Sequence, residues 1–137
     1  MTEYDVIVRS ILAHYPVTQA IYLFGTYGTA DERPYSDVDV AVLLPPDEAK
    51  RAQLMAIDNA RAAIERLIGK DVDLINLRLV STVFQKEITL TGRRIFCADL
   101  YAADEFEMLA LSFYQKLNEE RAEVMAEGLR SGRFYDV

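Results

Sequence analysis

The sequence predicts an α/β or α+β domain with one compact sheet. Short runs rich in β-branched and aromatic residues alternate with longer segments of helical periodicity. Hydrophobic residues make up 51% and charged residues 27% of the 137 residues, a composition typical of a globular domain. Because no repeat, low-complexity stretch or linker interrupts the chain, we expect a single domain over residues 1–137.

The N-terminal part predicts one helix and two strands. Thr2 can cap a helix over residues 2–15, and Pro16 ends it because proline lacks the backbone N–H that a helix needs. Two apolar runs with β-branched or aromatic residues then predict strands, over residues 17–24 (VTQAIYLF) and 37–44 (DVDVAVLL). The polar residues between these runs predict a loop.

The middle of the chain predicts one long amphipathic helix and a third strand. Asp47 is the expected N-cap of a helix over residues 47–68, and Gly69 follows its end as a C-terminal cap. Residues 71–77 (DVDLINL) predict the strand. The apolar residues of the helix recur at helical spacing and are expected to face the core: Leu54, Ile57, Ile64, Leu67 and Ile68.

The last part predicts a short helix, a strand and a long helix. The short helix is capped by Ser81 or Thr82 and runs through Thr91. Residues 93–97 (RRIFC) predict a fourth strand, and the pattern is helical again from about residue 101 to 129. We therefore expect a core over about residues 1–97, followed by a helical tail over about 99–130.

Charge and cysteine content exclude several classes of protein. A net charge of −7 argues against direct nucleic-acid binding, which needs a basic surface for the phosphates. No apolar run approaches the roughly 18 residues of a membrane span, and the acidic N-terminus does not resemble a signal peptide. Cys97 is the single cysteine, so the chain forms no internal disulfide and no cysteine zinc cluster. These features predict a cytoplasmic protein without a membrane partner.

The helical tail carries most of the net charge. Residues 99–127 hold eight acidic and two basic residues, and therefore −6 of the net −7. Its apolar residues form two groups: Phe106, Leu109, Phe113, Leu117 and Val124 on one stripe, and Met108, Leu111 and Tyr114 on another face. Either both groups are buried in the fold, or they form a partner interface with an acidic rim that attracts a basic protein.

Paired carboxylates provide the main candidate for chemistry. Asp37 and Asp39 lie two residues apart in a predicted strand, so their side chains project from the same face. Two neighbouring carboxylates repel each other, and a bound divalent cation such as Mg²⁺ relieves that repulsion. Asp71 and Asp73 repeat the spacing on the next strand, where one of them can join the first pair around the metal.

A glycine and a hydroxyl residue upstream make this pattern more specific. A pair of aspartates two apart arises by chance roughly once in a chain of this composition, and the chain contains two such pairs. Gly25-Thr26, however, stands at the end of the preceding predicted strand, with Thr26 eleven residues before Asp37. Glycine lets the backbone approach a phosphate closely, and backbone N–H groups and a hydroxyl can bind its oxygens.

These residues resemble a known family. Gly25-Thr26, ten intervening residues and Asp37-Val38-Asp39 resemble the G-S-x(10)-D-x-D signature of polymerase-β-type nucleotidyltransferases. The chain is similar to minimal nucleotidyltransferases (MNT), and its second half is similar to the MntA-like antitoxins of HEPN toxin–antitoxin modules. The resemblance implies a polymerase-β-like fold: a small mixed sheet of about four strands flanked by helices, with a long C-terminal helix.

The resemblance also implies roles for individual residues. Asp37, Asp39 and Asp73 would be the catalytic, metal-binding carboxylates, with Asp73 as the general base, and Gly25 and Thr26 would bind the nucleotide phosphates. The implied activity is Mg²⁺-dependent transfer of AMP from ATP to a tyrosine of a HEPN-type ribonuclease toxin. The toxin would be the partner in a hetero-oligomer, with the tail as its interface.

Asp71 remains an alternative third carboxylate, although Asp73 lies inside the predicted strand and Asp71 at its entry.

Two departures from the family pattern affect the phosphate site. Thr26 replaces the usual serine, and Gly28-Thr29-Ala30 stands where Ala-Arg-Gly is common, which removes an arginine. Arg33 is a candidate replacement from the same loop. The alternatives to the enzyme are a binding-only antitoxin with weak or no catalysis and a small-molecule nucleotidyltransferase.

Overall fold

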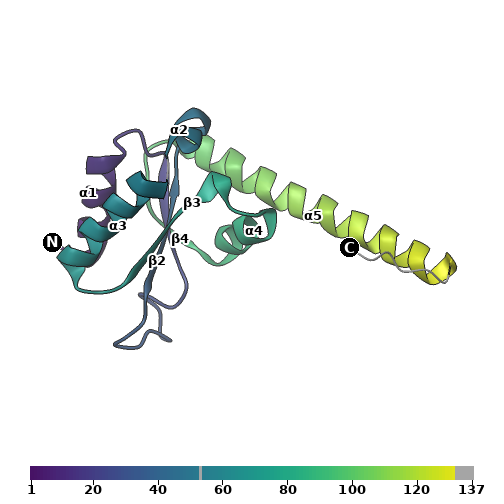
Figure 1. Cartoon of the computed structure of the whole chain (residues 1–137), viewed down its shortest axis with the longest axis horizontal. Coiled ribbons are helices and arrows are strands. Elements are labelled where there is room, and N and C mark those ends of the chain that lie inside the picture. The colour runs from purple at the N-terminus through teal and green to yellow at the C-terminus, as the bar shows by residue number, and fades with distance from the viewer. Residues whose placement is uncertain (53, 132–137) are drawn as a thin grey trace.

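The computed structural model describes residues 1–52 and 54–131, and it has a mixed four-stranded sheet with helices on both faces (Figure 1). The strands are β1 (Ala20–Phe24), β2 (Val38–Leu43), β3 (Val72–Asn76) and β4 (Arg93–Cys97). The helices are α1 (Glu3–His14), α2 (Pro46–Arg51), α3 (Leu54–Ile68), the 3₁₀ helix η1 (Leu77–Leu79), α4 (Thr82–Thr91) and α5 (Leu100–Ser131). The small mixed sheet and the long C-terminal helix confirm the predicted fold class.

The strand order β3-β2-β1-β4 places β1 and β2 at the centre of the sheet. β1 pairs antiparallel with β2 and with β4, whereas β2 and β3 are parallel. The parallel connection requires a crossover, which α2 and α3 provide. This arrangement brings the end of β1 and the starts of β2 and β3 to one end of the sheet.

Each face of the sheet has its own apolar core. Side chains of a strand alternate between the two faces, so Leu23 and Val40 pack toward α1 and α3, while Tyr22 and Ala41 pack toward α4 and α5. Figure 1 shows the same division, with α1 and α3 on one side of the strands and α4 and α5 on the other. Both central strands are therefore buried on both faces, which explains their nearly continuous apolar sequences.

The prediction of one continuous helix over residues 47–68 is wrong, because the two helices α2 and α3 occupy this region. α2 begins at Pro46, so Asp47 lies in its first turn and is not the N-cap. Ala52 then adopts an extended conformation with ψ 91°. The carbonyl oxygen of Ala49 accepts a hydrogen bond from Asn76 Nδ2 on β3 at 3.0 Å, a tertiary contact that helical periodicity does not reveal.

The apolar stripe of that region is partly confirmed. Ile57 and Ile64 are buried, but Leu67 is 65% exposed, so its predicted core position is wrong. Leu67 lies in the last turn of α3, where its side chain faces solvent while the neighbouring Ile68 packs against the core. Leu54 was also predicted to face the core, and its side chain lies outside the described part of the structure.

The first half of α5 covers the sheet, and the second half projects away from it (Figure 1). Phe106 and Ala110 are buried against the sheet, as predicted for Phe106. Leu109, Phe113 and Val124, which share the predicted stripe with Phe106, are exposed. Phe113 and Val124 follow the buried Ala110 along the helix, whereas Leu109 directly precedes it. Over residues 1–52 and 54–131, no helix is both long enough and apolar enough to span a membrane.

Candidate active site

The predicted site residues meet at the end of the sheet where β1 ends and where β2 and β3 begin. Asp39 on β2 lies in register with Asp73 on the parallel strand β3 and with Phe24 on β1. Asp37 precedes β2 by one residue, and Gly25 follows β1 directly. The structure therefore brings the three carboxylates and the glycine turn together, on the face of the sheet that α4 and α5 cover further along.

Gly25 is required by the close approach of the backbone to Asp39. Its φ is 72°, a left-handed conformation that residues with a Cβ rarely adopt. A Cβ built on Gly25 would overlap Asp39 Oδ2 and would lie only 3.2 Å from Asp39 Cγ. The missing side chain thus leaves the Asp39 carboxylate its position directly beside the backbone of the turn.

Thr26 lies next to this carboxylate group, in the loop between β1 and β2. Its hydroxyl donates a hydrogen bond to Ser36 Oγ at 3.3 Å, and Ser36 Oγ also accepts one from the backbone N–H of Arg33 at 2.8 Å. These contacts connect the two ends of the loop just before Asp37. Thr26 is exposed to solvent and is therefore accessible to a ligand.

The carboxylates of the site repel one another. Burial raises the pKa of Asp39 above its ordinary value, and the negative charges of Asp73 and Asp37 raise it further. A divalent cation would remove this repulsion, so the donor set fits such an ion. Within residues 1–52 and 54–131, no group of three or more Asp, Glu, His or Cys side chains is arranged to hold a metal ion by itself. An ion held here would take its remaining ligands from water and substrate, as Mg²⁺ commonly does.

The geometry favours Asp73 over Asp71 as the third carboxylate. Asp73 faces Asp39 across the β2–β3 pair and contributes to the raised pKa of Asp39. Asp71 precedes β3, and its carbonyl oxygen accepts a hydrogen bond from the N–H of Val38 at 2.9 Å. The backbone of Asp71 therefore aligns the two strands, while its charge is not among the causes that raise the pKa of Asp39.

Arg33, the candidate replacement for the arginine of the family pattern, is exposed, and its Nη1 donates to the hydroxyl of Tyr35 at 3.1 Å within the same loop. Sequence reasoning missed Tyr27, which is the only buried residue of the loop over residues 25–37. The signal that could have marked it is an aromatic residue two positions after Gly25, although Tyr35 in the same loop is exposed.

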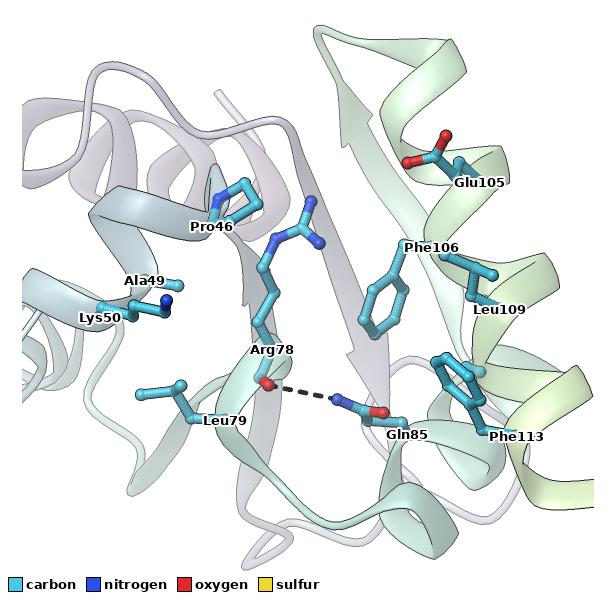
Figure 2. A pocket seen from close by; sticks show the side chains of 11 residues that line it. Pro46, Ala49, Lys50, Arg78, Leu79, Gln85, Glu105, Phe106, Leu109 and Phe113 are labelled. Carbon is cyan, nitrogen blue, oxygen red and sulfur yellow. Dashed lines mark hydrogen bonds between the residues drawn. The ribbon is translucent and has the colours of Figure 1, made fainter. Parts of the chain in front are cut away.

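A separate cavity lies at the other end of β2, as Figure 2 shows. It encloses about 300 Å³ between α2, η1 and α5, beginning at Pro46, which follows the end of β2. Arg78 forms part of its wall, with its guanidinium 5.5 Å from the centre of the Phe106 ring. The Gln85 amide donates to the carbonyl oxygen of Arg78 at 3.3 Å, the dashed contact in Figure 2. This cavity does not include the carboxylates.

The mixed sheet, the glycine turn and the carboxylates on neighbouring strands define a nucleotidyltransferase domain. The chain belongs to the polymerase beta nucleotidyltransferase family, which matches residues 7–101.

Similar proteins include a curated relative and several solved structures. The protein adenylyltransferase MntA of Shewanella oneidensis is 30% identical over 120 residues, covering 87% of this chain and 82% of the relative. A crystal structure of a toxin–antitoxin with AMP-PNP aligns with a TM-score of 0.80 and 26% identity, over 93% of this chain and 99% of that chain. A tri-AMPylated Shewanella oneidensis HEPN toxin in complex with MNT antitoxin aligns with a TM-score of 0.72 and 27% identity, over 93% and 96% of the two chains.

Proposed function

We propose that this protein is an antitoxin that transfers AMP from ATP to a tyrosine hydroxyl of a HEPN-type ribonuclease toxin. The observation that carries the proposal is the placement of Asp39 beside Gly25 on one strand and opposite Asp73 on the next. The similarity to MntA and to a complex with an AMPylated HEPN toxin supports protein adenylylation as the reaction. The similarity to a toxin–antitoxin with AMP-PNP supports ATP as the donor.

The carboxylates have distinct parts in this proposal. Asp37, Asp39 and Asp73 hold Mg²⁺, which when bound polarises the triphosphate and stabilises the negative charge that develops on it. Gly25 and Thr26 bind phosphate oxygens through backbone N–H groups and the Thr26 hydroxyl. The raised pKa of Asp39 supports a cation here, because an unneutralised group of three carboxylates is unfavourable.

The transfer itself is a nucleophilic displacement at the α-phosphorus. The tyrosine oxygen of the toxin forms a new P–O bond, the bond to the β-phosphate oxygen breaks, and pyrophosphate leaves. Asp73 accepts the proton of the tyrosine hydroxyl. It is exposed, so an acceptor from another protein can reach it, whereas Asp39 is half-buried.

The exposed part of α5 is the proposed toxin-binding surface. Leu109 and Phe113 are 39% and 55% exposed and stand at the rim of the cavity of Figure 2, so an apolar surface continues from the cavity onto the helix. Further along, Val124 and Met125 are also more than half exposed. The acidic residues Glu119, Glu120 and Glu123 flank this stripe. The surface therefore suits a partner with an apolar patch surrounded by basic residues.

The direct test is to incubate the chain with its toxin, ATP and Mg²⁺ and to weigh the intact toxin by mass spectrometry. We expect the toxin mass to increase by one or more AMP units and its ribonuclease activity to fall. A stable complex whose toxin gains no mass would refute the catalytic proposal.

A binding-only antitoxin is the second candidate function. The observation that favours it lies in the loop, where Arg33 contacts Tyr35 and the N–H of Gly28 donates to the Glu32 carboxylate at 2.6 Å. A loop whose arginine is bound to Tyr35, and with one N–H already bound to a carboxylate, is less suited to a triphosphate. The double variant Asp37→Asn/Asp39→Asn separates the two functions. Under the catalytic proposal it binds the toxin but does not protect cells, whereas a binding-only antitoxin protects fully.

A further inference from the structure

The loop between β1 and β2 is fixed to the rest of the protein at Tyr27. Every other residue from 25 to 37 is exposed or half-buried, whereas Tyr27 is 3% exposed. A polar surface loop is mobile unless side chains tie it to the scaffold. Since Tyr27 directly follows Gly25-Thr26, its contacts determine how firmly the proposed phosphate-binding turn is held.

The side chain of Tyr27 is anchored on α1. Its hydroxyl donates to Glu3 Oε2 at 2.5 Å, and its ring lies 5.9 Å from the ring of Tyr4. Lys70 contacts the same group from the α3–β3 connection, with Nζ 3.2 Å from Glu3 Oε2 and 5.0 Å from the centre of the Tyr27 ring. The hydrogen bond from Tyr27 is the largest cause that lowers the pKa of Glu3, so Glu3 is the ionised acceptor of a charge-assisted bond.

The backbone of Tyr27 is anchored on β4. Nη2 of Arg93 donates to the Tyr27 carbonyl oxygen. Gly28 follows with φ 78°, and a Cβ there would overlap the Tyr4 hydroxyl and lie 3.5 Å from Arg93 Nη2. Glycine is thus required at position 28, where the family that the sequence resembles commonly has alanine. Arg93 thus binds the backbone of the loop from the neighbouring strand β4.

We propose that Tyr27 is a positioning residue for ATP: its contacts with Glu3 and Arg93 hold the Gly25–Thr26 turn in the conformation that receives the phosphates. The inference rests on the proposed function and identifies what keeps its phosphate site formed. Tyr27 is buried between α1 and β4 and does not belong to the carboxylate group, so it acts through the turn.

This role affects binding more than chemistry. When only a fraction of the molecules has a competent loop, the apparent dissociation constant rises in inverse proportion to that fraction. Removing a hydrogen bond to a charged acceptor in this anchor is expected to weaken ATP binding by about threefold to tenfold. At saturating ATP the turn is held by its ligand, so kcat is expected to stay within about twofold of the parent value.

The test compares Tyr27→Phe with the matched control Tyr15→Phe in the full-length protein. Tyr15 packs against the same core, and its buried hydroxyl has no hydrogen-bond partner in the described chain, so its removal breaks no such contact. For both variants and the parent, we would measure the dissociation constant of ATP with Mg²⁺ by calorimetry, KM and kcat for AMP transfer, and the thermal midpoint. Glu3→Gln, which keeps an oxygen acceptor for Tyr27, provides a conservative second variant.

We expect Tyr27→Phe to raise the dissociation constant and KM together while kcat is retained, and Tyr15→Phe to change neither. Glu3→Gln is expected to lie between the parent and Tyr27→Phe. Equal ATP affinity of Tyr27→Phe and Tyr15→Phe, in a parent that binds ATP, would refute the positioning role alone. A parent that neither binds ATP nor transfers AMP would refute the proposed function and this inference with it. Loss of kcat without a change in KM would also overturn the positioning role.

Discussion

Replacing Gly25 with alanine is expected to remove most of the AMP-transfer activity while leaving the protein folded. The left-handed conformation at φ 72° costs an alanine about 1–2 kcal/mol, which a domain of this size can tolerate. In addition, the new Cβ would overlap Asp39 Oδ2 and stand 3.2 Å from Asp39 Cγ. Since ordinary contacts need about 3.5 Å, the carboxylate must shift by about 1 Å. A displacement of this size at a reacting centre costs about a hundredfold in rate.

Gly69→Ala is the matched control for this substitution. Gly69 has φ 69°, nearly the same as Gly25, but a Cβ built there meets no atom within 4 Å. Both variants therefore carry the same backbone strain, and only Gly25→Ala displaces Asp39. The assay measures the thermal midpoint and the initial rate of AMP transfer for both. Similar losses of stability with a large loss of rate for Gly25→Ala alone are expected, and equal rates for the two variants would refute the reasoning.

Three further predictions concern the site, a helix cap and α5. Because the pKa of Asp39 is raised, its contribution to stability is present at low pH and is lost as pH rises through its folded pKa. Asp39→Asn should therefore raise the thermal midpoint of the metal-free protein at neutral pH while abolishing AMP transfer, and an unchanged midpoint would contradict this. Ser81 caps α4 by accepting from the N–H of Phe84 at 3.2 Å, so Ser81→Ala should lower the unfolding free energy by about 1 kcal/mol, measured in urea. Phe106 is 8% exposed, so Phe106→Ala should lower the free energy of unfolding by about 3–5 kcal/mol. Phe113 is 55% exposed, so Phe113→Glu should weaken toxin binding in a pull-down while the thermal midpoint stays unchanged.

The placement of the candidate site residues could be predicted from the sequence better than the bounds of the helices. The spacing of Asp37 and Asp39 fixes their side chains to one face of a strand, because side-chain direction alternates along any strand. The glycine at position 25 indicates a backbone conformation that other residues rarely adopt, and its positive φ agrees with this. Both signals are local, so they can be recognised without knowledge of the tertiary structure. The register that sets Asp73 opposite Asp39 is not local, and only the structure supplies it.

The wrong predictions for the helices concern features that depend on tertiary structure. Periodicity continues through residues 47–68, but the contact between Asn76 and the carbonyl of Ala49 lies between elements and leaves no trace in the pattern. Leu67 and Phe113 are apolar and recur at helical spacing with buried residues, yet both are exposed. A hydrophobic stripe thus predicts the side of a helix that avoids water, and the length of the neighbouring surface decides how much of it is covered.

Two groups of acidic residues in the chain have different physical consequences. Asp39 is half-buried beside other carboxylates, so its repulsion is weakly screened, costs stability and strengthens the binding of a cation. Glu119, Glu120 and Glu123 are exposed on a projecting helix, where water and salt screen them, so they cost little. Their effect is on the encounter with a basic partner, whose rate depends on the summed potential of the surface. Under the proposed function, the negative charge within the sheet favours a bound cation, and the negative charge along α5 favours a basic partner.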